Sequence, residues 1–304
     1  MNRHTLFFMG ILSFLFGCGS NTPYQKKNGV WYYDDMSVST KHPSSFTPLN
    51  KRFAKADDFG FYRGSVVSGS DGKTFVAFNE HYAKDKSTVY YCDTYRKGQE
   101  YYTVKYNNIQ TIRGADAPSF VYLTGDYAKD KSSAYYEGVG FAVKDVASFE
   151  MLDIEFGKDK ITAYFHQEEI KGSEGSSFEM LNHHYSKDRH AVYYSEMSRN
   201  ATVTGPTPIN TNIKGALNAS FVVYEDGYAA DSVNAYFKGK WLCKVNPLFT
   251  VLDYGYAKTD NKIFYQGKEV TGADAVSFKI ADLRSIEYDA ADKSYSYKEG
   301  KKIQ

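Results

Sequence analysis

The sequence carries almost no net charge. It has 37 Lys and Arg residues against 36 Asp and Glu residues, which gives a formal net charge of +1. Nucleic-acid binding depends on a concentrated positive field, which this balance does not supply, and no acidic tail is present. We therefore expect no nucleic-acid partner. The hydrophobic share of 42% is within the globular range and excludes wholesale disorder.

The chain also lacks a hydrophobic run long enough to span a membrane as a helix. The apolar run from Leu6 to Gly17 has twelve residues, whereas a membrane-spanning helix needs roughly 20. Arg3 precedes the run, and a short positive start before an apolar stretch of this length is typical of a secretory signal. The run ends in Leu15-Phe16-Gly17-Cys18, which resembles the bacterial lipobox, in which the cysteine is lipidated.

This resemblance implies a lipoprotein. Residues 1–17 would be the signal peptide, Cys18 the lipidated residue, and residues 18–30 a flexible tether. The membrane is then a partner through the N-terminal lipid, and the cell envelope is the location. Gly19 and Ser20 lack the Asp of inner-membrane lipoproteins, so the resemblance implies the outer membrane in a Gram-negative cell. The alternative is an ordinary secreted protein.

Cysteine is scarce, and lipidation of Cys18 would leave only Cys92 and Cys243. An exported compartment permits a disulfide bond. The two residues belong to units four apart, however, and a disulfide needs Cα atoms within about 7 Å. A bond between them would imply a ring or a sharp fold-back, and the sequence leaves this open.

Motifs of known catalytic chemistry are missing as well. The chain contains no G-x-S-x-G, no P-loop, no G-x-G-x-x-G and no Cys-His pair that merits attention. We expect no cofactor and predict that the protein is not an enzyme.

Aromatic residues, by contrast, are abundant, with 28 Tyr and 21 Phe. Aromatic residues favour pleated, half-buried surfaces, so the composition indicates an all-β protein. Many of them lie in one recurring phrase. Residues 127–136 read YAKDKSSAYY, and related phrases occupy residues 82–91, 156–165, 185–194, 228–237 and 256–265. A chain built from copies of one phrase is a repeat protein.

Each repeat can be counted from the Phe that lies seven residues before its phrase. The starts are Phe46, Phe75, Phe120, Phe149, Phe178, Phe221, Phe249 and Phe278. The base spacing is 29 residues, and two repeats carry insertions of about 16 and 14 residues. Trp31-Tyr32-Tyr33 resembles the second half of a truncated unit, so we place the repeat domain at residues 31–304.

Within a repeat, each position has a physical role. A turn with a capping Asp, such as Asp116, precedes the first Phe. The phrase itself predicts a hairpin, because Asp130 and its equivalents can bond their own downstream backbone. Two consecutive aromatics, such as Tyr135-Tyr136, point to opposite faces of a strand, so both faces must be covered. In the Phe249 repeat the Asp shifts by one position, to Asp260. One unit buries too little apolar surface to fold alone, so stacking should make the fold.

The phrase resembles the motif of the DKNYY repeat family, here Asp130 to Tyr136 and its copies. The resemblance extends over nearly all of residues 31–304 and implies a bacterial protein, often a lipoprotein, without an assigned activity. We expect about eight hairpin units in a solenoid-like stack. A closed β-propeller is the alternative, although three short strands per unit, as we expect, are few for a propeller blade.

Two groups of polar residues could bind metal ions. A repeated Asp between two lysines is better explained as a turn former than as a calcium ligand, which needs several oxygens at close spacing. His183, His184 and His190 with Asp188 form the densest cluster, and His166 with Glu168 and Glu169 is the next. Neither cluster has the spacing of a known zinc motif, so we interpret them as surface histidines and predict no metal site.

Function is expected where the repetition breaks, since insertions in repeat arrays often carry the binding face. The first insertion contains our candidate binding residues Tyr95, Tyr101, Tyr102 and Arg113, although it could be merely a longer hairpin. The second, Ser195 to Lys214, is rich in Thr, Asn and Pro. We predict a non-enzymatic envelope lipoprotein with a binding or scaffolding surface for an envelope protein or glycan. The alternative is an envelope enzyme, which a cleft clustering Glu168, Glu169 and Glu174 would favour.

Overall fold

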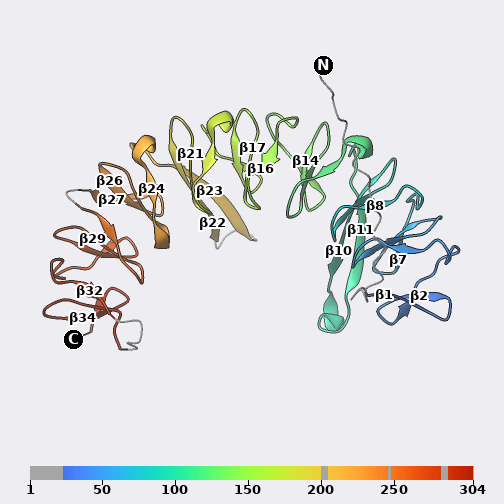
Figure 1. The fold of residues 1–304 in the computed structure, drawn as a ribbon, viewed down its shortest axis with the longest axis horizontal. Coiled ribbons are helices and arrows are strands. Elements are labelled where there is room, and N and C mark those ends of the chain that lie inside the picture. The colour runs from blue at the N-terminus through green and yellow to red at the C-terminus, as the bar shows by residue number, and fades with distance from the viewer. Residues whose placement is uncertain (1–22, 200–204, 246–247, 282–286, 304) are drawn as a thin grey trace, which may run out of the picture. The chain divides into compact units, whose positions relative to one another are not determined.

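The computed structural model describes residues 23–303, apart from 200–204, 246–247 and 282–286. The described residues form an all-β protein built from small antiparallel sheets that follow one another in chain order, with a few short 3-10 helices (Figure 1). The predicted signal peptide, Cys18 and residues 19–22 of the predicted tether lie outside the described residues. Among the residues that are described, no helix has the length and apolar character of a membrane span.

The chain divides into two compact units, Met1–Arg113 and Gly114–Gln304, which are described separately. The described part of unit 1 holds three sheets. Their strands are β1 (Tyr24–Lys27), β2 (Val30–Tyr33) and β3 (Met36–Ser37); β4 (Thr47–Pro48), β5 (Phe53–Lys55), β6 (Gly60–Tyr62) and β7 (Ser65–Val67); and β8 (Val76–Ala77), β9 (Tyr82–Lys84), β10 (Val89–Tyr95) and β11 (Tyr106–Thr111), with the 3-10 helix η1 (Gly98–Glu100).

Unit 2 holds six four-stranded sheets. Their strands are β12 (Val121–Tyr122), β13 (Tyr127–Lys129), β14 (Ala134–Tyr136) and β15 (Val139–Phe141); β16 (Glu150–Met151), β17 (Phe156–Lys158), β18 (Ala163–Phe165) and β19 (Glu168–Glu169); β20 (Glu179–Met180), β21 (Tyr185–Lys187), β22 (Val192–Arg199) and β23 (Pro206–Asn212); β24 (Val222–Val223), β25 (Tyr228–Ala230), β26 (Asn234–Phe237) and β27 (Lys240–Lys244); β28 (Thr250–Val251), β29 (Tyr256–Lys258), β30 (Ile263–Tyr265) and β31 (Lys268–Glu269); and β32 (Lys279–Ile280), β33 (Ala290–Ala291), β34 (Ser296–Lys298) and β35 (Lys301–Lys302). The 3-10 helices are η2 (Ala117–Ser119), η3 (Gly175–Ser177), η4 (Asn218–Ser220) and η5 (Glu225–Gly227).

Each full repeat is therefore a four-stranded antiparallel meander, and our expectation of three strands was wrong. The additional strand consists of the two residues after the first Phe, for example β12, which pairs with β13. Two residues are too short for a hydrophobic alternation to be recognised in the sequence. The strand count consequently gives no argument against a propeller blade. The predicted all-β repeat array is confirmed, and no sheet among the described residues closes into a barrel.

The truncated unit at the start of the domain is longer than the sequence analysis predicted. Tyr24 pairs with Tyr33 as Tyr127 pairs with Tyr136 in the Phe120 repeat, so β1 is equivalent to β13. This unit lacks only the first of the four strands. The described repeat structure thus begins at Tyr24, inside the stretch assigned to a flexible tether.

The hydrophobic core lies at the junctions between consecutive repeats. One cluster joins Phe156 and Phe165 of the Phe149 repeat to Phe178 and Tyr193 of the next. Another joins Tyr185 and Tyr194 to residues of the Phe221 repeat. Since each such cluster needs two repeats, a single repeat has no core of its own, which agrees with the expectation that stacking makes the fold. The two aromatics of the third strand face opposite neighbours.

A tyrosine hydroxyl adds a polar link at several of these junctions. The hydroxyl of Tyr228 donates to the carbonyl of Gly255 (3.0 Å) and accepts from the amide of Gly267 (3.1 Å) in the following repeat. Gly267 has a φ of +73°, and a Cβ there would lie 2.3 Å from the ring of Phe237. The turn between the third and fourth strands therefore needs glycine for both its backbone conformation and its close approach to the preceding repeat.

Both insertions are extensions of the hairpin formed by the third and fourth strands. In unit 1, β10 and β11 pair from Tyr90–Thr111 out to Tyr95–Tyr106. In unit 2, β22 and β23 pair from Tyr193–Asn212 out to Arg199–Pro206. The first insertion is thus the longer hairpin that the sequence analysis gave as one possibility.

Candidate functional site

The repeated Asp of the phrase is a buried hydrogen-bond acceptor. In the Phe120 repeat, Oδ1 of Asp130 accepts the amides of Ser132 (2.7 Å) and Ser133 (2.8 Å). Its Oδ2 accepts the amide of Asp116 (2.8 Å) and the hydroxyl of Tyr135 (2.7 Å). The carboxylate thus joins the turn before the first Phe, the hairpin turn and an aromatic of the next strand. The sequence pattern predicts only the hairpin contacts.

The same arrangement recurs in six repeats. The Asp and Tyr pairs are Asp85 and Tyr90, Asp130 and Tyr135, Asp159 and Tyr164, Asp188 and Tyr193, Asp231 and Tyr236, and Asp292 and Tyr297. Burial alone would raise the pKa of Asp130, but the amide and hydroxyl donors outweigh it and lower that pKa to about 2. Burial, together with the contact to Asp130, raises the pKa of Tyr135 to about 12. These carboxylates are structural anions with all their acceptor positions in use, which supports the turn-former interpretation.

The Phe249 repeat departs from this pattern. The position equivalent to the buried Asp is occupied by Thr259, whose hydroxyl accepts the amide of Lys262 (3.1 Å). Asp260, which the sequence analysis assigned to this role, is exposed. Phe264 stands where the other repeats have the hydroxyl-bearing Tyr, so the acceptor and its phenol donor are absent together.

The lysines on either side of the Asp have other partners. The ammonium group of Lys131 pairs with Asp116 at 2.8 Å. That of Lys129 donates to the carbonyls of Val146 (3.2 Å), Ala147 (3.0 Å) and Phe149 (2.7 Å), in the turn that leads into the next repeat and at its first residue. One lysine therefore closes its own repeat, and the other connects it to its neighbour.

The predicted histidine clusters are not brought together as the sequence order suggests. Nδ1 of His184 hydrogen-bonds with the carbonyl of Ser195 (3.0 Å), and His190 faces Glu174 at 3.8 Å. His166 lies 3.9 Å from Glu155 and forms no ion pair with Glu168 or Glu169 in the described structure. The His183 side chain lies against the preceding repeat.

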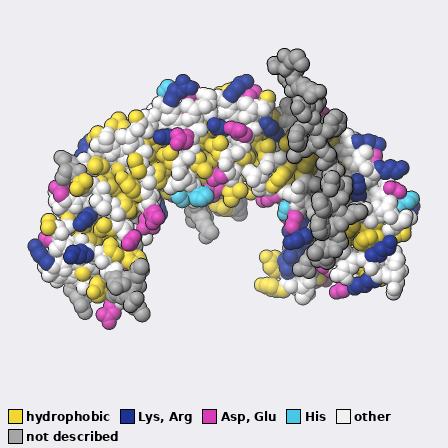
Figure 2. Space-filling model, viewed as in Figure 1, with side chains coloured by type: hydrophobic (Ala, Val, Ile, Leu, Met, Phe, Trp, Pro, Cys, Tyr) yellow, Lys and Arg dark blue, Asp and Glu magenta, His cyan; other side chains and the backbone are white. Residues whose placement is uncertain are grey.

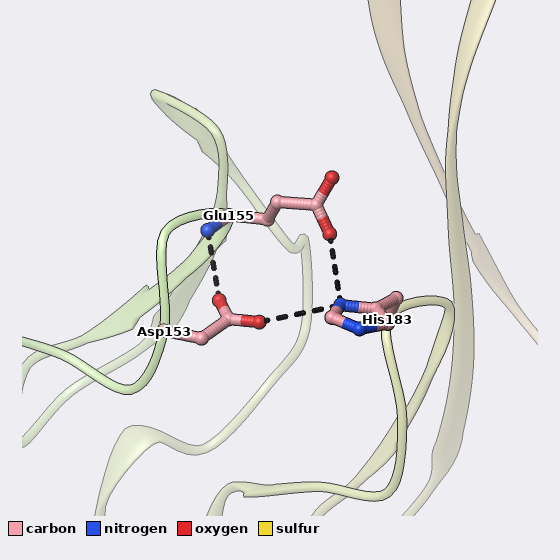
Figure 3. A group of neighbouring side chains, drawn as sticks. All are labelled: Asp153, Glu155 and His183. Atoms are coloured by element: carbon pink, nitrogen blue, oxygen red, sulfur yellow. Dashed lines mark hydrogen bonds and ion pairs between the residues drawn. The ribbon is translucent and has the colours of Figure 1, made fainter. Parts of the chain in front are cut away.

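There, His183 meets two carboxylates (Figure 3). Its Nδ1 lies 3.4 Å from Oε2 of Glu155 and 3.7 Å from Oδ2 of Asp153. One ligand atom from each of the three residues lies within 4.8 Å of the others. Sequence order does not reveal this group, because its members come from two repeats. The signal in the sequence was that His183 and Glu155 both occupy the loop before the phrase.

The candidate binding residues of the first insertion lie at opposite ends of the β10–β11 hairpin. Tyr95 stacks on Tyr106 at 5.4 Å between ring centroids, and Tyr101 contacts Tyr102 edge to face at the tip of the same hairpin. Tyr102 is 88% exposed. Arg113 is also exposed but follows β11 at the opposite, inner end of the hairpin, where Thr111 pairs with Tyr90. The structure therefore groups the three tyrosines and leaves Arg113 apart.

The tip also carries cationic groups. The ammonium of Lys97 lies 4.6 Å from the centroid of the Tyr106 ring, and the guanidinium of Arg96 donates to the carbonyl of Tyr101 (2.6 Å). Tyr106 in turn donates to Glu100. These contacts hold an exposed aromatic surface bordered by positive charge.

The second insertion, residues 195–214, contains no aromatic residue. Pro206 and Pro208 lie in β23, opposite Arg199 and Met197, and Met197 and Ile209 are exposed. Residues 200–204, at the outer end of this hairpin, lie outside the described residues.

A groove of about 510 Å³ runs along the loops of three consecutive repeats in unit 2. Its lining residues are Asn182, His183, His184, Tyr194, Tyr224, Glu225, Asp226, Gly227, Phe237, Lys238, Tyr254, Gly255 and Gln266. Tyr224 and Tyr254 are both exposed. The space-filling view of unit 2 shows hydrophobic side chains interspersed with acidic and basic ones over the visible face (Figure 2).

The three acids that would favour an enzyme are not gathered in one cleft. Glu168 and Glu169 line a cavity of about 410 Å³ in which Glu169 pairs with Lys144 at 3.1 Å. Glu174 is outside that cavity and pairs with Arg189.

The two described cysteines are free. Cys92 is buried in the core of unit 1 and Cys243 is partly buried in unit 2. Burial raises the pKa of the Cys92 thiol, which disfavours its reactive thiolate form.

Comparison with known proteins gave one match. The sequence model of the DKNYY family matches residues 7–94 and 140–197. No curated protein and no solved structure matches the chain.

Proposed function

This chain belongs to the DKNYY family of repeat proteins, and from that premise we propose that it is a non-enzymatic cell-envelope lipoprotein that presents a binding or scaffolding surface. The supporting observation is the structural use of the repeated chemistry. The carboxylate of Asp130 has its donors in place, and the paired phenol of Tyr135 is buried. The residues that recur in each repeat are used to hold the fold together. A binding surface is therefore expected in the segments that do not recur.

The proposed binding surface is the tip of the β10–β11 hairpin. Tyrosine offers a large, rigid contact area with a polar end, which suits recognition of a protein or a glycan. Tyr101 and Tyr102 are among the exposed large hydrophobic residues, and Lys97 adds positive charge beside them. An envelope protein or an envelope glycan is the partner class that fits this surface.

Attachment to the membrane would come from Cys18. The motif at residues 15–18 supports lipidation, and the lipid would hold the repeat domain at the envelope surface. Replacement Cys18→Ser should abolish incorporation of labelled fatty acid and move the protein from the membrane fraction to the soluble fraction. Retention of lipid in that variant would contradict the proposed anchor.

The binding proposal is tested by crosslinking in cells followed by mass spectrometry. The double variant Tyr101→Ser, Tyr102→Ser should lose crosslinks to a specific envelope partner. Tyr295→Ser, an exposed tyrosine on the last repeat, serves as the control and should keep them. For a glycan partner, the same variants are compared in a pulldown with isolated envelope polysaccharide. Equal capture of both partner classes by the double variant and the wild type would reject the hairpin tip as the binding surface.

A further inference from the structure

We propose that Asp153, Glu155 and His183 form a binding site for a divalent transition-metal ion of the zinc class. The site would join two consecutive repeats of unit 2. Asp153 and Glu155 lie in the loop between β16 and β17 of the Phe149 repeat, and His183 lies in the loop between β20 and β21 of the Phe178 repeat. An ion held by all three would cross-link the two loops.

The distances between the ligand atoms suit such an ion. Nδ1 of His183 is 3.4 Å from Glu155 Oε2 and 3.7 Å from Asp153 Oδ2, and all three atoms lie within 4.8 Å of one another (Figure 3). Zinc bonds to nitrogen and oxygen ligands at about 2.0–2.2 Å, so ligands in a tetrahedral arrangement are separated by roughly 3.3–3.6 Å. The His183 side chain is 76% exposed, which leaves it room to shorten its 3.7 Å distance to Asp153 Oδ2.

Asp153 is held with one oxygen directed at the site. Its Oδ1 accepts the amides of Glu155 (2.8 Å) and Phe156 (2.6 Å). Its Oδ2 is buried and has no hydrogen-bond partner among the described residues. A buried carboxylate oxygen without a donor is costly. A bound cation would offset that cost without moving the carboxylate, because the two amides already fix it.

A second imidazole lies on the other side of Glu155. Nε2 of His166 is 3.9 Å from Glu155 Oε1, is buried, and also lacks a hydrogen-bond partner within the described structure. Glu155 thus lies between two histidines. With its Oε2 on the metal, its Oε1 could accept from His166, the usual arrangement in which an outer partner orients a ligating carboxylate. Three protein ligands would leave the fourth position to water.

The donor set selects the class of ion. Imidazole nitrogen suits zinc, copper, nickel and iron, whereas calcium and magnesium prefer sets made only of oxygen. One histidine and two carboxylates, with a second histidine nearby, therefore favour zinc over the alkaline-earth ions.

Equivalent loops at other junctions are already joined by a direct interaction. In unit 1, Arg52 and Glu80 occupy the positions of Glu155 and His183, and they form an ion pair of 2.8 Å. Later in unit 2, Asp226 accepts the amide of Gly255 at 2.8 Å. Between Asp153, Glu155 and His183 the distances are longer, and a metal ion would supply the connection.

The test uses the full chain, purified without a histidine tag, and zinc chloride as the probe. Competition with a chromogenic chelator should show one site, and His183→Ala should weaken zinc binding at least tenfold. Asp153→Asn, which can keep the Oδ1 contacts, should weaken binding similarly. His190→Ala is the control, because this exposed histidine of the same repeat lies outside the group, and its affinity should equal that of the wild type.

Two further measurements report on the site itself. Cobalt(II) should give the intense visible absorption of a low-coordinate N/O site, and His183→Ala should abolish it. Zinc should raise the melting temperature of the wild type and of His190→Ala, but not that of His183→Ala. The proposal is overturned if the folded wild type does not bind zinc, or if His183→Ala and Asp153→Asn bind it as the wild type does. In that case the three residues form ion pairs only.

Discussion

The buried hydroxyl of Tyr135 donates a hydrogen bond of 2.7 Å to the buried carboxylate of Asp130, five residues earlier in the chain. The same pair of residue types recurs at the same spacing in five further repeats. In the two full repeats where the Asp is replaced, the hydroxyl is missing too: Ala56 is followed by Phe61, and Thr259 by Phe264. The two groups therefore act together: the tyrosine hydroxyl donates a hydrogen bond to the buried carboxylate, in addition to the backbone amides.

Removing this hydroxyl should destabilise the fold measurably. Tyr135→Phe keeps the ring in the core but leaves Oδ2 of Asp130 with one donor fewer. Hydrogen bonds to charged groups contribute about 1.5–3 kcal/mol, so we expect a loss of about 1–2 kcal/mol in the free energy of unfolding, measured by chemical denaturation. Tyr122→Phe removes a hydroxyl whose bond to the Gly125 carbonyl is exposed, and it should cost less than about 0.5 kcal/mol. Equal losses would show that the buried pair has no special role.

The buried aspartates should make stability depend on pH in the acid range. The donors around Asp130 lower its pKa to about 2, against an ordinary value near 4 in the unfolded chain. A lowered pKa contributes stability that is complete above about pH 4 and is lost as the pH falls through about 2. Asp130→Asn should be less stable than the wild type at pH 6, and the difference should shrink towards pH 2. A difference that stays constant over this range would contradict the assignment of a charged Asp130.

A comparison of two glycines can distinguish the cost of a left-handed backbone from the cost of steric overlap. Gly267 and Gly272 both have positive φ, +73° and +81°, but only Gly267 faces a neighbouring side chain, the ring of Phe237. Gly272→Ala should cost about 1–2 kcal/mol from the left-handed backbone alone. Gly267→Ala adds overlap with the preceding repeat and should cost about 3 kcal/mol or more in the free energy of unfolding. Equal losses of unfolding free energy for the two variants would mean that the ring of Phe237 can shift to accommodate the added methyl group.

The two thiols should react at different rates. Cys92 is buried and its pKa is raised by burial, whereas Cys243 is only partly buried. Without reductant, iodoacetamide should label Cys243 faster than Cys92 in the folded protein, and both should be labelled after denaturation, as followed by peptide mass mapping. Failure to label either thiol in denaturant without reductant would instead indicate a disulfide bond.

Much of the repeat could be predicted because its signals are local. The hairpin turn at Asp130 and the cap at Asp116 follow from bonds between residues two or three apart. The first strand of each repeat could not be predicted, because two residues such as Val121 and Tyr122 carry no periodic pattern. The start of the domain was placed too late for a similar reason, since β1 is recognisable only by its pairing of Tyr24 with Tyr33.

Of the candidate sites, the sequence located the aromatic hairpin but not its geometry. Tyr95, Tyr101 and Tyr102 lie on one tip, and Arg113 lies at the other end because β11 runs the length of the hairpin between them. Of the group of Asp153, Glu155 and His183, only His183 belonged to a predicted cluster, since sequence proximity favoured His184 and His190 as its partners.

The sequence by itself determined the all-β repeat, its period and the residues that form each turn, because backbone hydrogen bonding and side-chain alternation act over a few positions. Only the tertiary structure decided which side chains meet across a junction. Glu155 and His183 are neighbours because consecutive repeats place their loops side by side, and the Asp130 carboxylate is buried because the turn at Asp116 folds back onto it. Such contacts depend on packing between segments distant along the chain, which no local pattern records.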